Sequence, residues 1–416
     1  MELRTSMKTS SIKSQDTKKY EYIDILRAIA ILGVLAVHSH QQIENLSTIT
    51  SSVFNYGQLG VQLFFIASAL TLCLSASERK ENNPFNFYVR RFFRIAPLYY
   101  FGIILYFFWS CLLNAYKGNF GIPQGYTFLS VLENIFFVHG FDPSNFNFVV
   151  PGGWSIATEM FFYAIFPFLF ALLSTLPFRT FVVVSFVIAI FSFFSQYIAI
   201  EILQPFLMEK GTIKTILKND EFGYLYTLII NQINVFMIGM IAFKFLHKKI
   251  ERKFLFLAAG LVIVSCFLQN NHTYDTGYDG FIYTILSSCA FAIFAIKLSG
   301  TSIPDNAFYR ALINIGRNSF SMYIMHFIVI DVLRFVLGKS IYKVIGVSDL
   351  KIAVIFPLLV VITYYLAKKT NKYIENPGIN FGKRFIKAAA GNSIENEKGV
   401  KIQQCDAQRF QSERGN

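Results

Sequence analysis

The sequence is poor in charged residues. Asp, Glu, Lys and Arg make up only 15% of its 416 residues, whereas a soluble domain carries about 25%. Acidic residues are scarcer than basic ones: the chain has 25 Asp and Glu residues but 38 Lys and Arg residues, which gives a net charge of +13. Apolar residues replace the charge: 54% of the chain is hydrophobic and 47 residues are Phe. This composition indicates a membrane protein without a soluble domain.

Cysteine is scarce as well, and its spacing matches neither metal ligands nor a disulfide framework. We therefore interpret the five cysteines as small apolar side chains and expect no metal site. The positive charge does not indicate nucleic acid either. Basic residues cluster in short runs between apolar segments, as in cytoplasmic loops that face anionic lipid, and no motif that reads DNA or RNA is present.

Apolar stretches long enough to cross a bilayer predict an all-α integral membrane fold with about ten transmembrane helices. They lie near residues 22–42, 57–76, 94–113, 155–174, 179–199, 225–246, 254–270, 279–298, 318–338 and 351–368. An eleventh apolar stretch, 128–138, is too short to span and is predicted to be interfacial or re-entrant.

With ten spans, most basic runs fall on one side of the membrane, so the positive-inside rule predicts that both termini are cytoplasmic. Arg334, Lys339 and Lys343 fall on the other side. The chain then divides into a basic cytoplasmic tail (1–20), a transmembrane domain (21–387) and a polar tail (388–416) that we expect to be disordered.

Two ionisable residues lie inside the first apolar run, YIDILRAIAILGVLAVHSH: Arg27 and His38. An ionisable residue in a membrane-spanning helix is costly to keep, so it marks a functional site by default. At about 1.5 Å per residue the two lie roughly 16 Å apart along a helix. The predicted orientation puts Arg27 near the cytoplasmic face and His38 in the outer half.

Glu159 lies about one turn inside the outer end of the fourth predicted span, PGGWSIATEMFFYAIFPFLF. We therefore expect Glu159 and His38 to reach one depth and form a general-base pair, in which Glu159 holds the imidazole tautomer. The alternative is that each side chain fills a separate polar gap between helices.

Three arginines, Arg90, Arg91 and Arg94, lie in FYVRRFFRIAPLYY, where the third span leaves the cytoplasm. Arg90 and Arg94 share a helix face at i, i+4, and guanidinium groups bind phosphate bidentately. We predict a phosphate-binding cluster, although an anchor that only sets topology would show the same spacing.

Other candidate site residues are polar side chains in or beside the spans. Trp154 suits the membrane interface, and Ser155 suits a helix N-cap. Gln62 and Ser68 lie in GVQLFFIASAL, whose small residues permit close helix packing. Tyr323 and His326 lie inside the ninth span, where a lone histidine is more often a packed, hydrogen-bonded residue than a catalyst.

Together these segments resemble the membrane-bound acyltransferase-3 family, whose members acylate bacterial surface sugars. The matching segments, in chain order, are DILRAIAILGVLAVH, GVQLFFIASAL, FYVRRFFRIAP, WSIATEMFFYAIFP, FSMYIMHF and YIENPGINFGKRF. Two positions depart from the family pattern: Gln62 stands where Asp is usual, and Ala69 replaces a usual Gly.

The resemblance implies a multi-pass O-acyltransferase of the bacterial inner membrane, with acyl-CoA, usually acetyl-CoA, as donor substrate and no permanently bound cofactor. The acceptor would be a hydroxyl of a glycan such as O-antigen or exopolysaccharide. His38 could deprotonate that hydroxyl or carry the acyl group itself. The sequence leaves the acceptor, the acyl chain length and the oligomeric state open.

Two other classes of protein are alternatives to an acyltransferase. A transporter or flippase of a lipid-linked glycan would also have about ten spans and buried ionisable residues. The lack of an internal repeat and the arginines suited to phosphate favour the acyltransferase. A purely structural membrane protein would leave the buried His and Glu unexplained.

Overall fold

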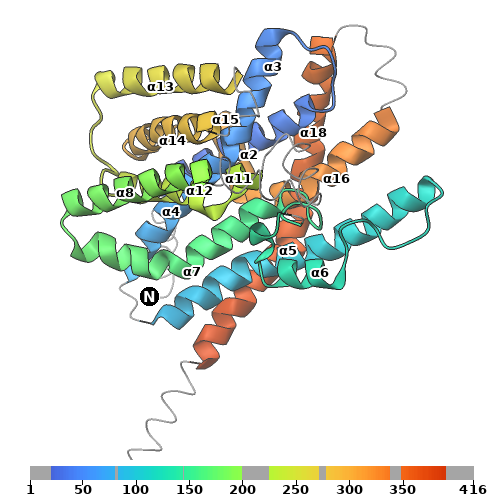
Figure 1. Ribbon diagram of the computed structural model, residues 1–416, viewed down its shortest axis with the longest axis horizontal. Helices are drawn as coiled ribbons and strands as arrows, with labels where there is room; N and C mark the ends of the chain where they lie inside the picture. Colours follow the sequence, from blue (N-terminus) through green and yellow to red (C-terminus); the bar gives the residue numbers. More distant parts are fainter. Residues whose placement is uncertain are drawn as a thin grey trace, which may run out of the picture.

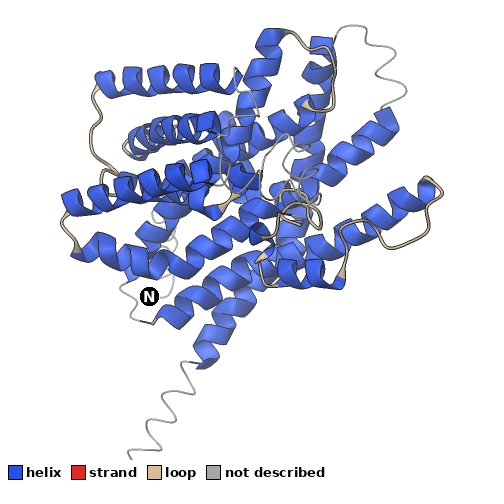
Figure 2. Ribbon diagram, in the orientation of Figure 1, coloured by secondary structure: helices blue, strands red, loops and turns tan. Residues whose placement is uncertain are grey.

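The computed structural model describes residues 20–79, 83–143, 145–198, 224–270, 278–337 and 348–389. These ranges consist of helices and connecting loops and contain no strand (Figure 2), so the prediction of an all-α fold is confirmed for them. The two predicted tails lie almost wholly outside the described residues, as do Lys339 and Lys343.

Figure 1 labels the helices. Their bounds are α2 (Glu21–His40), α3 (Thr48–Asn55), α4 (Gly60–Arg79), α5 (Pro84–Tyr116), α6 (Phe128–Ile135), α7 (Gly153–Thr175), α8 (Phe178–Tyr197), α11 (Tyr224–Thr227), α12 (Ile229–Phe243), α13 (Arg252–Asn270), α14 (Tyr278–Ser299), α15 (Ala307–Arg317), α16 (Ser319–Leu337) and α18 (Ser348–Thr370). Short turns of 3₁₀-helix precede α4 and α7, at Tyr56–Leu59 (η1) and His139–Phe141 (η2). A π-helix, η4 (Asn371–Glu375), continues α18 into a last helix over residues 376–389.

Nine helices in the described ranges are long and apolar enough to cross a membrane. The remaining predicted span, 225–246, corresponds to α12, which has 15 residues and is shorter than the roughly 20 that a bilayer core requires. The predicted non-spanning stretch is α6, whose eight residues extend only about 12 Å. The number of spans in the described ranges therefore depends on α12.

One span begins well before its predicted start. Asn83 caps α5 by accepting a hydrogen bond from the backbone N–H of Phe85 (2.9 Å), and Pro84 occupies the first helical position, a favoured start signal. The helix therefore begins ten residues before residue 94. The arginines that were predicted at its entry lie within its first three turns.

The helix that carries Arg27 and His38 lies at the centre of the bundle. α2 packs against α4, α15, α16 and α18. One close approach of two backbones lies where Gly57 of η1 meets Gly33 of α2, because a Cβ built on Gly57 would lie 2.3 Å from the Gly33 carbonyl oxygen. The outer helices α8 and α13 lie at the left edge of Figure 1. They expose large side chains such as Phe186 and Phe256, as lipid-facing helices do.

The segment between α5 and α7 folds back onto the middle of α5. Tyr99 donates a hydrogen bond to the Asn134 side-chain oxygen (2.6 Å) and Tyr100 donates to the Ile135 carbonyl (2.8 Å). His139 stacks on the Tyr99 ring (5.8 Å between centroids) and donates to the Gly153 carbonyl (3.0 Å); burial lowers the pKa of His139. α7 therefore begins beside the middle of α5 rather than beside its outer end.

Trp154 packs inside the bundle rather than on its surface. Its side chain is only 8% exposed, and its ring meets those of Phe65 and Tyr226 edge-on at 6.3 and 6.0 Å between centroids. Trp154 is a core residue at the first turn of α7. Ser155 is not the N-cap either, because Gly152 takes that position with φ +79°.

Candidate active site

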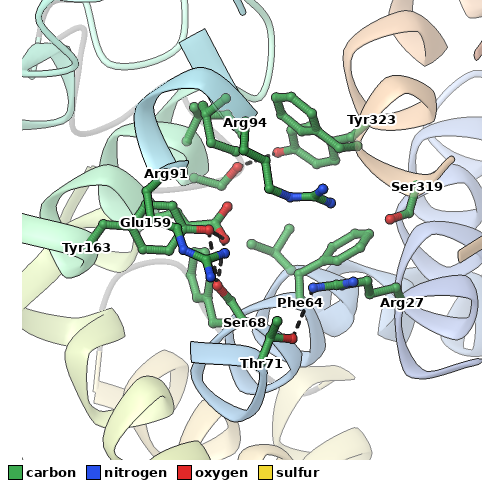
Figure 3. A pocket seen from close by; sticks show the side chains of 16 residues that line it. Arg27, Phe64, Ser68, Thr71, Arg91, Arg94, Glu159, Tyr163, Ser319 and Tyr323 are labelled. Atoms are coloured by element: carbon green, nitrogen blue, oxygen red, sulfur yellow. Dashed lines mark hydrogen bonds between the residues drawn. The ribbon is translucent and has the colours of Figure 1, made fainter. Parts of the chain in front are cut away.

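A pocket lies between α2, α4, α5, α7 and α16 (Figure 3). Three arginines from two helices and one glutamate from a third face it, together with hydroxyl groups and aromatic rings. Its lining residues are Arg27, Val61, Phe64, Phe65, Ser68, Thr71, Arg91, Arg94, Ile95, Ser155, Ile156, Glu159, Tyr163, Ser319, Phe320 and Tyr323.

Glu159 is the acidic group on the pocket wall. Its Oε1 accepts hydrogen bonds from the Ser68 hydroxyl (2.6 Å) and from the Tyr163 hydroxyl. The Arg91 guanidinium lies 5.7 Å from the centre of the Tyr163 ring, and both Arg91 and Arg27 interact electrostatically with Glu159. The carboxylate thus balances part of the positive charge of the pocket.

Arg27 is held on the opposite wall. Its Nη2 donates to the Thr71 hydroxyl (3.0 Å), and its Nη1 lies 3.8 Å from the Asp24 carboxylate, one helical turn earlier. Asp24 in turn accepts from Arg317 of α15 (3.1 Å). These contacts fix the direction of the Arg27 side chain while leaving its head on the pocket surface.

The arginines of α5 that reach the pocket are not the pair that the sequence predicted. Arg91 and Arg94, at i, i+3, line the pocket, whereas Arg90 is not among its lining residues. Arg90 and Arg94 were expected to face a ligand together at i, i+4, but the helix face that lines the pocket carries Arg91 and Arg94 instead. Arg94 extends between the pocket and Glu375, whose Oε1 lies 3.9 Å from its Nη2.

A second hollow opens from this pocket toward the ends of α2 and α4. The two share Arg27, Thr71 and Arg91 in their linings, and the hollow is also lined by Tyr20, Ile23, Asp24, Leu74, Ser75, Glu78 and Arg79. Tyr20 precedes α2 and Arg79 ends α4. The two hollows therefore adjoin at the end of the bundle where α2 begins and α4 ends.

His38 lies outside the lining of this pocket. Its Nδ1 is 2.9 Å from the side-chain oxygen of Gln41. An amide oxygen can only accept a hydrogen bond, so Nδ1 carries the proton and Nε2 keeps its lone pair. The imidazole packs against Phe327 and His326 of α16, at 4.5 and 5.3 Å between ring centroids.

The predicted hydrogen-bonded pair of His38 and Glu159 is therefore not formed in this structure. Glu159 bonds to Ser68 and Tyr163, and His38 bonds to Gln41. The reason is the start of α7: because the preceding segment folds back, Glu159 faces the pocket from the wall opposite Arg27 rather than lying beside His38.

Tyr323 and His326 connect the pocket to His38. The Tyr323 hydroxyl, on the pocket wall, lies 2.8 Å from the Ser155 hydroxyl and donates to the Gly152 carbonyl (2.9 Å). The rings of Tyr323 and His326 are 5.5 Å apart. Gly152 permits this contact, because its φ is positive and an added Cβ would lie 2.8 Å from the Tyr323 hydroxyl.

His326 is fully buried. Its Nδ1 donates to the Tyr323 carbonyl (2.6 Å), and its Nε2 makes no hydrogen bond to any described residue. Ser155, Tyr323 and His326 thus lie in succession between the pocket and His38.

Comparison with known proteins identifies the family. A family model described as an acyltransferase domain matches residues 20–367. The chain belongs to acyltransferase family 3. It is therefore a multi-pass membrane acyltransferase, and the match includes every residue that lines the pocket. No curated protein and no solved structure matches it.

In this acyltransferase, Gln62 belongs to a separate polar contact. Its side chain is fully buried, and its amide nitrogen donates to the Tyr226 hydroxyl (2.8 Å) and to the Gln232 side-chain oxygen (3.0 Å). The Gln232 oxygen only accepts, so an amide N–H satisfies it where a carboxylate, which also only accepts, would not. Gln62 joins α4 to α11 and α12 and does not line the pocket.

The sequence analysis did not select three residues of the candidate site. Thr71 holds Arg27, Gln41 orients His38 and Glu375 faces Arg94. A signal existed for two of them, since Thr71 lies one turn after Ser68 and Gln41 lies one turn after His38. Glu375 lies in the family-like segment YIENPGINFGKRF, but its contact with Arg94 joins distant parts of the sequence, and that pairing had no local signal.

Proposed function

We propose that this membrane acyltransferase moves an acyl group, most simply acetyl, from cytoplasmic acyl-CoA to a hydroxyl of an extracytoplasmic glycan such as O-antigen or exopolysaccharide. The proposed location is the inner membrane of a bacterium. The observation that carries the proposal is the convergence of Arg27, Arg91 and Arg94 on one pocket that continues toward the ends of α2 and α4.

The pocket suits the donor. CoA carries several phosphate groups, and guanidinium groups bind phosphate with paired, charge-assisted hydrogen bonds. Three guanidinium groups beside low-dielectric walls favour the binding of a polyanion, which a pocket with an uncharged lining would exclude. Basic residues at the same end of the bundle, such as Arg79, agree with a cytoplasmic entrance. The thioester end of the donor would extend past Tyr323 toward His38.

His38 suits the chemical step. Its Nε2 lone pair, left free by the Gln41 contact, accepts the proton of the acceptor hydroxyl as the oxygen attacks the thioester carbon. The carbon–sulfur bond then breaks, and the proton passes from His38 to the departing CoA sulfur. His326 and Tyr323 line the route to this atom, whereas Glu159 acts at the donor end by balancing Arg27 and Arg91.

The test uses purified protein in lipid nanodiscs with radiolabelled acetyl-CoA. Wild-type protein is expected to bind acetyl-CoA and to release CoA in the presence of acceptor glycan. A cell-based comparison adds the acceptor: surface glycan from cells with the gene should show O-acetyl signals in NMR spectra that cells without it lack. Absence of both acetyl-CoA binding and the O-acetyl signals would reject the proposal and favour the alternative, a glycan transporter.

A further inference from the structure

Glu375 is a buried carboxylate that joins three elements around the pocket. It ends the π-helix η4 and is only 2% exposed. Its Oε2 accepts a hydrogen bond from Ser321 of α16 (2.7 Å), and its Oε1 faces Nη2 of Arg94 of α5 at 3.9 Å. Neither carboxylate oxygen belongs to the pocket lining, so Glu375 would act through Arg94.

The backbone around Glu375 is built to hold this position. A π-helix inserts one extra residue per turn into an α-helix and often marks a functional site. Here it stands between α18 and the last described helix. That last helix packs on α5 through ring contacts of Phe381 with Phe93 (5.1 Å) and of Phe385 with Phe85 (6.3 Å). Glu375 is thereby fixed relative to the helix that carries Arg94.

The separation of the two charges indicates what the contact does. A buried carboxylate is costly unless it is paired, and Ser321 supplies only one hydrogen bond. A distance of 3.9 Å is longer than a hydrogen bond, so Glu375 attracts the guanidinium without taking up one of its N–H donors. The Arg94 side chain is still 32% exposed. Its planar fork therefore remains available to a ligand in the pocket.

We propose that Glu375 is a positioning residue that holds Arg94 ready for a phosphate group of the donor. The proposal rests on the proposed function, because it takes acyl-CoA as the ligand. In this arrangement the donor phosphate completes a buried network that runs from Ser321 through Glu375 to Arg94. The negative charge of Glu375 keeps Arg94 in place before the donor arrives.

The test separates donor binding from turnover. Glu375→Gln keeps an oxygen that can accept from Ser321 but removes the charge. We expect the KM for acetyl-CoA to rise about tenfold, as for the loss of roughly 1.4 kcal/mol, with kcat changed by less than about threefold. In an Arg94→Ala background the same substitution should cause no further rise, because interacting residues are not additive.

Controls exclude a structural effect. Ser321→Ala, which keeps the charge, should change KM by less than about threefold. Asp349→Asn removes a carboxylate at the far end of α18, where it accepts from the Ser47 backbone N–H (3.0 Å), and should leave KM unchanged. Glu375→Asp, which retains a negative charge, should fall between wild type and Glu375→Gln, and it is the second variant if Glu375→Gln does not fold.

Three outcomes would overturn the positioning role. They are additive effects of Glu375→Gln and Arg94→Ala on KM, a fall in kcat without a change in KM, and wild-type kinetics in Glu375→Gln. If the wild-type protein itself neither binds nor uses acetyl-CoA, the proposed function fails instead, and that result is read from the wild type alone.

Discussion

Gln41, three residues after His38, determines which nitrogen of the His38 ring carries the proton. Gln41 fixes the proton on Nδ1 and leaves Nε2 as the basic atom. We expect His38→Ala to reduce acyl transfer on the order of 100- to 10,000-fold while the protein still inserts and folds. The measurement is release of CoA from acetyl-CoA in nanodiscs, with thermal stability as the folding check.

His40 provides the matched control for His38. It lies near the same helix end, but its Nε2 contacts the Ser51 hydroxyl (2.9 Å) rather than the route to the pocket. His40→Ala should therefore be much milder than His38→Ala. Near-normal transfer by a well-folded His38→Ala protein would remove His38 from the mechanism.

The arginines of α5 give a second test at the scale of single residues. Because Arg91 and Arg94 line the pocket and Arg90 does not, Arg91→Ala and Arg94→Ala should weaken acetyl-CoA binding by about tenfold or more, and Arg90→Ala by much less. Lysine should rescue only partly, since it lacks the planar fork. Isothermal titration calorimetry measures the change. Normal acetyl-CoA binding by Arg91→Ala and Arg94→Ala would reduce the cluster to a topology signal.

At the scale of elements, sequence patterns predicted nine of the spans because long apolar runs are a strong and local signal. Arg27, Ser68, Arg91 and Glu159 were likewise predictable, since polar groups inside such runs are rare. The position of Glu159 relative to His38 was not predictable. It depends on the contacts that Tyr99 and Tyr100 of α5 make with Asn134 and Ile135, and these contacts leave no periodic pattern in the sequence.

The crossing of η1 over α2 yields a prediction about an element. Gly57→Val should destabilise the protein by about 3 kcal/mol or more, because its Cβ would lie 2.3 Å from a backbone oxygen of Gly33 and overpacking at a rigid contact is costly. Since α2 would shift, both Arg27 and His38 would be displaced. Thermal unfolding in detergent measures the loss.

Gly260 of α13 is the matched control for Gly57. A Cβ on Gly260 would meet nothing within 4 Å, and alanine is favoured over glycine in a helix by about 1 kcal/mol. Gly260→Ala should leave the melting temperature unchanged or raise it slightly. If Gly57→Val melted like wild type, the close crossing of η1 and α2 would be refuted.

At the scale of the whole molecule, the proposed orientation predicts which loops face outward. In a background without native cysteines, a thiol reagent that cannot cross the membrane should label a cysteine at Asn119, which is exposed between α5 and α6. It should not label one at Lys249, which is exposed between α12 and α13, until the membrane is permeabilised. The reverse pattern would invert the molecule and move the arginine pocket to the outer side.

The depth of that pocket has an electrical consequence. Arg27 lies six residues into α2, about 9 Å along the helix, which is roughly a third of a 30 Å bilayer core. In the proposed orientation, each phosphate charge that reached Arg27 would cross about a third of the membrane voltage, worth roughly 0.7 kcal/mol per charge at 100 mV. A negative cell interior drives anions outward. The voltage of an energised membrane would therefore draw the donor into the pocket and slow the release of free CoA.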